Sequence, residues 1–227
     1  MKIAEMFYSI QGEGMLAGVP SVFVRTSGCN LRCHWCDTPY TSWEPEGEEC
    51  SLETIVAYVK QHSTGHVVIT GGEPMIAPEI ANLTQALRRL GQHITIETAG
   101  TVFAPVECDL MSISPKLANS IPLERDGGRW AAAHERLRIQ PEILRRLAEG
   151  WEHQFKFVVC NASDLTEIKE LICLLEVHGK RVILMPEGTD PVTLRERGRW
   201  LAELCMREGF RFSGRLHIEL FGNRRGI

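Results

Sequence analysis

Short strand-like runs alternate with amphipathic helical segments along most of the chain, and this alternation restricts the possible folds more than any other feature. Strands are predicted at residues 3–8, 21–25, 67–70, 94–97, 110–114, 155–159 and 182–185, and residues 216–220 close the pattern. Helices are predicted after the N-cap Ser51, over about 78–90 and 165–175, and from Asp190 to near Gly209. Such alternation produces a mostly parallel sheet with helical crossovers. Too few units are present for an eight-fold barrel, so an α/β fold with a smaller or incomplete barrel is expected.

The composition describes an ordinary globular chain of 227 residues, with 44% hydrophobic and 24% charged residues. A net charge of −4 gives no basic field that would attract nucleic acid. No apolar stretch is long enough to span a membrane, and the first residues do not read as a signal peptide, so we expect a cytoplasmic protein. No repeat or linker divides the chain, which predicts one domain over 1–227. Its weakest part is a variable connection at about 119–153, with one helix expected near 141–147.

Three of the eight cysteines lie within eight residues, in a C-x3-C-x2-C array formed by Cys29, Cys33 and Cys36. Three thiolates at this spacing can hold three irons of a 4Fe-4S cluster and leave the fourth iron open. The alternative is a structural zinc site, which needs a fourth ligand such as His34 or Cys50. The absence of a second Cys pair at zinc-ribbon spacing favours the cluster. The remaining cysteines, expected to be small core residues, are Cys50, Cys108, Cys160, Cys173 and Cys205.

Two strand ends carry further candidate groups. The strand at 67–70 runs into Gly71-Gly72-Glu73-Pro74, where glycines allow a close approach of the backbone and a carboxylate can accept from an amine. Glu97 ends an apolar strand, and sites form at the carboxyl ends of parallel barrel strands. The cysteine array and the Gly-Gly-Glu-Pro turn, one βα unit apart, together resemble the signatures of the radical S-adenosylmethionine superfamily. In that superfamily, S-adenosylmethionine binds the open iron of the cluster.

Several longer segments resemble the 7-carboxy-7-deazaguanine synthase family within that superfamily. They are residues 7–14, 25–29, 36–38, 97–101, 114–116 and 217–226. The resemblance implies an incomplete (β/α)6-type barrel with a cluster loop at 28–43, usually a homodimer. It implies a carbon-nitrogen lyase that converts 6-carboxytetrahydropterin to 7-carboxy-7-deazaguanine with loss of ammonia, in 7-deazapurine and queuosine biosynthesis. The implied cofactors are a 4Fe-4S cluster, S-adenosylmethionine and Mg²⁺, with an electron donor such as flavodoxin.

The resemblance also implies roles for individual residues, position by position. The cluster ligands are Cys29, Cys33 and Cys36, and the magnesium ligand is Thr38. Contacts to S-adenosylmethionine come from Trp35, Cys36, Asp37, Gly72, Glu73, Ser114, Pro115 and Lys116. The substrate site comprises Ile10, Gln11, Gly12, Arg25, Thr70, Glu97, His217 and Ile227. Two positions depart from the family pattern: Met185 replaces a glutamine, and Ala99 replaces an asparagine.

Two other functions share the cysteine loop. One is an activase that installs a glycyl radical on a partner protein, which would need a docking surface in place of a pterin pocket. The segments around Gln11 and Glu97 argue against it. The other is a noncatalytic regulator that binds zinc or a cluster. Turnover with the pterin separates the first from the proposed enzyme, and metal analysis separates the second.

Overall fold

The computed structural model describes all residues, 1–227, and is built on one nine-stranded sheet in the order β3-β1-β2-β4-β5-β6-β7-β8-β9. From β2 to β9 every neighbouring pair is parallel, whereas β1 runs antiparallel to both β2 and β3. The strands are β1 (Lys2–Ile10), β2 (Pro20–Thr26), β3 (Glu48–Glu49), β4 (His66–Gly71), β5 (His93–Thr98), β6 (Leu110–Ile113), β7 (His153–Val159), β8 (Val182–Pro186) and β9 (Arg211–Phe212). No pairing joins β9 to β3, so the curved sheet stays open and the predicted incomplete barrel is confirmed.

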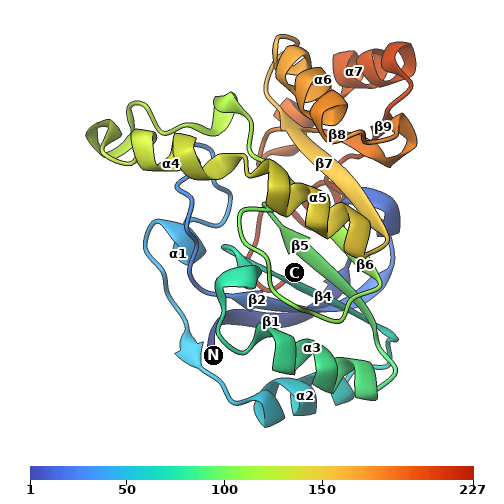
Figure 1. Cartoon of the computed structure of the whole chain (residues 1–227). Helices are drawn as coiled ribbons and strands as arrows, with labels where there is room; N and C mark the ends of the chain where they lie inside the picture. The colour runs from blue at the N-terminus through green and yellow to red at the C-terminus, as the bar shows by residue number, and fades with distance from the viewer.

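The α-helices that connect the parallel strands lie mainly on the outer face of the sheet (Figure 1), and the chain has eight α-helices in all. They are α1 (Pro39–Ser42), α2 (Leu52–Lys60), α3 (Ile80–Arg89), α4 (Ala131–Arg138), α5 (Pro141–Gly150), α6 (Asp164–Leu174), α7 (Pro191–Glu208) and α8 (Leu216–Phe221). The predicted caps are present: Ser51 Oγ accepts from Thr54 N at 3.2 Å, and Asp190 accepts from two amides of α7. Gly209 ends α7 with a φ of 72°, a conformation that glycine adopts without strain. None of the helices is long and apolar enough to cross a lipid bilayer.

Side chains alternate between two environments along the parallel strands, because successive residues of a strand point to opposite faces. One set packs under the helices in the main core, as Ile94 and Ile96 of β5 do. The other set points to the inside of the curved sheet, where Thr95 and Glu97 of the same strand lie. This alternation places polar residues inside the sheet while the strands remain apolar on the helix side.

Three expectations are corrected by the structure. The closing segment 216–220 is helix α8 rather than another strand, since it lies beyond the last paired edge and buries only Ile218. The connection 119–153 holds two helices, α4 and α5, where one was expected. Cys173 is exposed on α6 rather than in the core, whereas Cys108 and Cys205 are buried as predicted. Cys50 and Cys160 are half-buried. The short strands β3 and β9 were not predicted.

Candidate active site

One cavity of about 240 Å³ opens at the carboxyl ends of the parallel strands and collects most of the candidate residues. The candidates on its wall are Ile10, Gln11, Gly12, Arg25, Cys29, Cys33, Trp35, Cys36, Asp37, Thr38, Thr70, Gly72, Glu97, Ser114, Lys116, His217 and Ile227. Glu73 and Pro115 do not line it. Residues more than 200 positions apart therefore meet at one place, as expected for this edge of a parallel sheet.

The three clustered cysteines form one side of this cavity, around the buried side chain of Leu31. The Cys29 sulfur accepts a hydrogen bond from Leu31 N at 3.4 Å, and the Cys36 sulfur lies 3.3 Å from Ser42 Oγ. Burial raises the pKa of Cys29 to about 12 and also raises that of Cys33. Thiols in this state are protonated at neutral pH, so iron would replace protons when it binds. The donor set and its amide contact fit a cluster held by three thiolates.

The zinc alternative is not assembled by the structure. His34 is exposed, and neither His34 nor Cys50 lies on the wall of the cavity. No group of three or more His, Cys, Asp or Glu side chains converges closely enough to hold a single metal ion.

The Gly-Gly-Glu-Pro turn packs against the start of the cysteine loop. A Cβ atom on Gly72 would lie 2.2 Å from Gly28 O and 2.7 Å from Cys29 Cβ, so only glycine fits there. Glu73 is fully buried behind the cavity wall, where it contacts the wall residues Thr98 and Ala99. Its carboxylate accepts from Thr98 Oγ1 at 2.7 Å, from Ala99 N at 2.8 Å and from Met75 N at 3.1 Å. Burial raises the pKa of Glu73, although these three donors favour its charged form.

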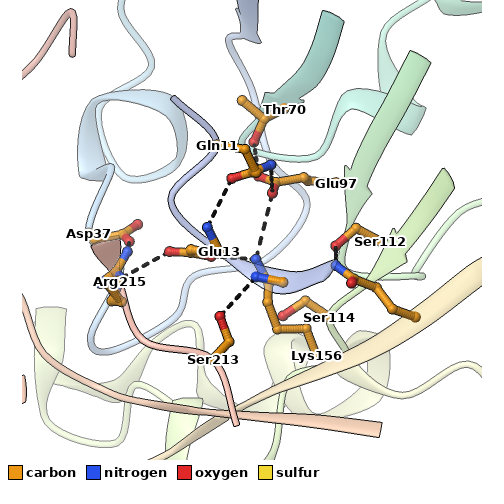
Figure 2. Close-up of polar contacts among 12 residues, drawn as sticks. Gln11, Glu13, Asp37, Thr70, Glu97, Ser112, Ser114, Lys156, Ser213 and Arg215 are labelled. Atoms are coloured by element: carbon orange, nitrogen blue, oxygen red, sulfur yellow. Dashed lines mark hydrogen bonds and ion pairs between the residues drawn. The ribbon is translucent and has the colours of Figure 1, made fainter. Parts of the chain in front are cut away.

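Glu97 lines the same cavity as the cysteines. Its two carboxylate oxygens have separate partners (Figure 2). Oε1 accepts from Gln11 Nε2 at 3.2 Å, and Oε2 accepts from Thr70 Oγ1 at 3.0 Å. Lys156 Nζ lies 3.6 Å from Oε1 and supplies a positive charge. Each oxygen keeps a lone pair for a ligand, so this group can accept two hydrogen bonds from a planar donor edge.

Beside Glu97 lies a chain of paired charges, of which the sequence had singled out only Asp37, as a contact to S-adenosylmethionine (Figure 2). Glu13 pairs with Lys156 and, at 2.9 Å, with Arg215 Nε, while Arg215 also pairs with Asp37. Burial opposes the charged form of Glu13, but Lys156 and Arg215 outweigh it and lower the pKa of Glu13. Burial likewise works against the charge of Lys156, and Glu13 and Glu97 raise its pKa above the usual range. All four groups are therefore charged at neutral pH.

Gly12 and His217 are in direct contact. A Cβ atom on Gly12 would lie 1.8 Å from His217 Nδ1, and Leu216 N donates to Gly12 O at 2.9 Å. Burial lowers the pKa of His217 in spite of the nearby carboxylate of Glu13, so its imidazole is neutral at pH 7. The first helical turn of α8 is thereby fixed against the end of β1.

Arg25 and the end of the chain meet at Glu5. Arg25 Nε donates to Glu5 Oε1 at 2.7 Å, and Tyr40 OH donates to the same oxygen at 2.8 Å. Gly226 N donates to Glu5 Oε2 at 3.2 Å, which brings the last residue, Ile227, to the cavity. The hydrogen bonds of the Arg25 guanidinium within the protein are confined to Nε, so both Nη groups remain open to a ligand.

The remaining candidates on the cavity wall are held by local hydrogen bonds. Lys116 Nζ donates to Ser114 O at 2.7 Å and to Ser114 Oγ at 2.8 Å, which folds the segment after β6 around its ammonium group. The indole of Trp35 donates to Asn119 O at 3.0 Å. Thr38 lies just before α1, with its hydroxyl 3.8 Å from the Cys36 sulfur.

The comparisons with known proteins agree with this geometry. Residues 23–116, which include the three cysteines, match the family model of the radical SAM superfamily. The protein is therefore a radical S-adenosylmethionine enzyme, a class that works with a 4Fe-4S cluster. The 7-carboxy-7-deazaguanine synthase of Rhodopirellula baltica is 46% identical over 225 residues, covering 99% of this chain and 88% of that protein. The synthase of Halobacterium salinarum is 44% identical over 234 residues, covering 98% and 91%. The chain belongs to the 7-carboxy-7-deazaguanine synthase family.

The crystal structure of QueE from Escherichia coli superposes with a TM-score of 0.70 at 28% identity, covering 95% of this chain and 94% of that chain. The match extends over nearly the whole fold, including the open parallel sheet. The family assignment that the sequence motifs predicted is therefore confirmed by relatives and by a solved structure.

Proposed function

We propose that this enzyme converts 6-carboxytetrahydropterin to 7-carboxy-7-deazaguanine with release of ammonia. One observation carries the proposal: a single cavity is lined both by the three cysteines and by the acceptor Glu97 with its partners Gln11 and Thr70. A radical source and a recognition group for a planar heterocycle then face the same space. This arrangement brings the bound heterocycle next to the group that starts its rearrangement.

Recognition of the pterin falls to Glu97. The guanidine-like edge of a pterin presents adjacent N–H donors, and a carboxylate accepts two such donors side by side. Gln11 and Thr70 orient the carboxylate, and the nearby ammonium of Lys156 stabilises its charge. The rest of the proposed pocket is formed by Ile10, Gly12 and His217, where the backbone of β1 and the neutral imidazole border the ring.

The substrate carboxylate is assigned to Arg25, whose free Nη groups form the planar fork that suits bidentate binding. Thr38 is the proposed magnesium ligand. A single neutral hydroxyl holds Mg²⁺ weakly, so the substrate carboxylate and water would complete the coordination. The end of the chain at Ile227 closes the same side of the cavity.

Cys29, Cys33 and Cys36 would hold the cluster, and the neighbouring cavity wall would hold S-adenosylmethionine. The proposed contacts are Trp35, Cys36, Asp37, Gly72, Ser114, Pro115 and Lys116. Glu73 is proposed to act indirectly, since its carboxylate is occupied by Thr98, Ala99 and Met75 and fixes the turn that carries Gly72. When bound, the cluster and S-adenosylmethionine supply the radical that starts the rearrangement. The protein positions both reactants and excludes water.

We further propose a cytoplasmic homodimer that receives its electron from a donor such as flavodoxin. The eight cysteines form no disulfide, which is consistent with a reducing compartment. The homodimer and the electron donor follow from the family resemblance.

The test is an anaerobic assay of the reconstituted enzyme with 6-carboxytetrahydropterin, S-adenosylmethionine, Mg²⁺ and dithionite. We expect four irons per chain, ammonia release and formation of 7-carboxy-7-deazaguanine. Cys33→Ala should lose both cluster and turnover, whereas Cys173→Ala, at an exposed thiol on α6, should keep both. One tightly bound zinc per chain, or consumption of S-adenosylmethionine only with a protein substrate, would contradict the proposal.

A further inference from the structure

His134 lies in α4, inside the connection 119–153, and no proposed function uses it. Its side chain is almost fully buried, with 2% of the residue exposed, and both ring nitrogens have partners. Nδ1 lies 3.1 Å from the backbone nitrogen of Arg32, in the middle of the cysteine loop. Nε2 lies 2.9 Å from Ser120 Oγ. The histidine therefore joins α4 to the cluster loop and to the turn at Ser120.

The partners determine where the protons lie. The backbone N–H of Arg32 can only donate, so His134 Nδ1 must accept and the ring proton must be on Nε2. Ser120 Oγ donates to Leu117 O at 2.6 Å and is therefore free to accept from Nε2. Burial, with a contribution from Arg138, lowers the pKa of His134 to about 4, in agreement with a neutral ring. The hydrogen bonds from Arg32 N through His134 and Ser120 to Leu117 O therefore each have a defined donor and acceptor, and both ring nitrogens have a partner.

These contacts hold the backbone N–H groups of Arg32 and His34, the two residues that flank Cys33 in the sequence. Arg32 N donates to His134 Nδ1, and His34 N donates to Ser120 O at 2.8 Å. The hydrogen bond between Ser120 Oγ and His134 Nε2 connects the two residues that supply these acceptors, so both contacts belong to one hydrogen-bonded network. Cys33 is the most enclosed thiol of the three, and its own carbonyl accepts from the Trp43 indole at 3.0 Å.

We propose that His134 is a positioning residue for the cluster, which acts by holding the backbone of Cys33 at the distance and angle that an iron ligand needs. The inference rests on Cys33 as a cluster ligand. Groups that orient metal ligands contribute strongly to metal retention even though they never touch the metal. Helix α4 lies beside the cluster loop, on the α1 side of the molecule (Figure 1). The variable connection thus has a function: it supplies the histidine that fixes the loop.

Two amide substitutions separate the two bonds of the ring. In His134→Asn, Oδ1 occupies the place of Nδ1 and can still accept from Arg32 N. In His134→Gln, the longer side chain reaches Ser120 and leaves Arg32 N without an acceptor. The matched control is His178→Asn, because His178 is exposed and its Nδ1 also accepts a backbone amide, Lys180 N, at 3.2 Å far from the cluster.

The measurements are iron retention against a chelator, the EPR spectrum of the reduced cluster with and without S-adenosylmethionine, and thermal unfolding of the apoprotein. We expect His134→Gln to weaken iron retention about 10- to 100-fold and to alter the EPR signal, as loss of an orienting partner commonly does. His178→Asn should stay close to the parent in both readouts. His134→Asn, which keeps the contact to Arg32 N and loses only the one to Ser120, should retain iron better than His134→Gln. A purely structural role would change thermal unfolding and leave the EPR signal of the loaded enzyme unaltered.

The proposal is overturned if His134→Gln and His134→Asn retain iron equally and share the parent EPR signal. Cys33→Ala separates this failure from a failure of the site itself. Retention of an intact cluster by Cys33→Ala would overturn the ligand assignment, and the role of His134 with it. Loss of the cluster in Cys33→Ala, together with equal behaviour of the two His134 variants, would overturn the role of His134 alone.

Discussion

Replacing Glu13 by glutamine tests whether the buried charge chain stabilises the fold. Glu13 pairs with Lys156 and with Arg215, and its side chain is only 11% exposed. Removing one partner of a buried ion pair costs about 3–5 kcal/mol, because the other charge is left unpaired. Here each cation keeps a second carboxylate, Glu97 at 3.6 Å from Lys156 and Asp37 next to Arg215. We therefore expect the lower end, about 3 kcal/mol, and a fall in Tm of about 6–12 °C for a chain of this size.

The pH dependence gives this prediction a sign. The folded-state pKa of Glu13 lies below its ordinary value of 4.5, so its contribution is present above pH 4.5 and is lost as the pH falls towards the folded pKa. Glu13→Gln lacks that contribution at every pH. The difference in unfolding free energy between parent and variant should therefore be largest near pH 7 and shrink below pH 4.5.

Urea and thermal unfolding of both apoproteins at pH 7 and pH 3.5 measure this difference, and Glu196→Gln, at an exposed unpaired glutamate, is the control. A difference that does not change with pH would refute the electrostatic reasoning. So would a Glu13→Gln variant as stable as the control at pH 7, because the charge chain would then contribute nothing.

Two further substitutions test the substrate pocket. Gly12→Ala would place a Cβ atom 1.8 Å from His217 Nδ1, so the ring must move. We expect kcat/KM to fall about 100-fold with cluster content unchanged, as measured by steady-state kinetics and iron analysis. Parent-like kinetics would show that the contact between Gly12 and His217 does not shape the substrate pocket. Arg25→Lys keeps the charge but loses the planar fork that reaches both Glu5 and a carboxylate, so KM for the pterin should rise about 10-fold. An unchanged KM would remove Arg25 from the carboxylate site.

Much of the fold could be predicted because its signals are local. Parallel strands are buried on both faces and therefore read as short apolar runs, as at β4 and β8. Ser51 and Asp190 are recognisable N-caps. Helix α4 was missed because its stability does not come from an apolar stripe. Its buried side chains are His134 and Arg138, which make polar contacts with distant segments.

The site divides in the same way. Motifs with a short spacing, such as the cysteine array and the Gly-Gly-Glu-Pro turn, could be located from the sequence alone. The charge chain could not, because its partners are far apart: Glu13 is 143 residues from Lys156 and 202 residues from Arg215. No local sequence pattern predicts an ion pair between residues so far apart. The pairs form only when the fold brings together the segment after β1, strand β7 and the segment before α8.

One signal for Lys156 was nevertheless present in the sequence, in the alternation of β7. Phe155, Phe157 and Val159 pack in the helix-covered core, so Lys156 must point to the inside of the sheet. The same parity gives the inward polar residues of the neighbouring strands: Arg25, Thr70, Glu97 and Ser112. A polar residue whose position in a buried parallel strand points its side chain to the inside of the sheet is therefore a site candidate on physical grounds alone. A slip of one residue would turn Lys156 into the apolar core, away from both Glu13 and Glu97, at the full cost of an unpaired buried charge. The ion pair that borders the pocket thus also fixes the register of β7, and the same residue serves fold and site.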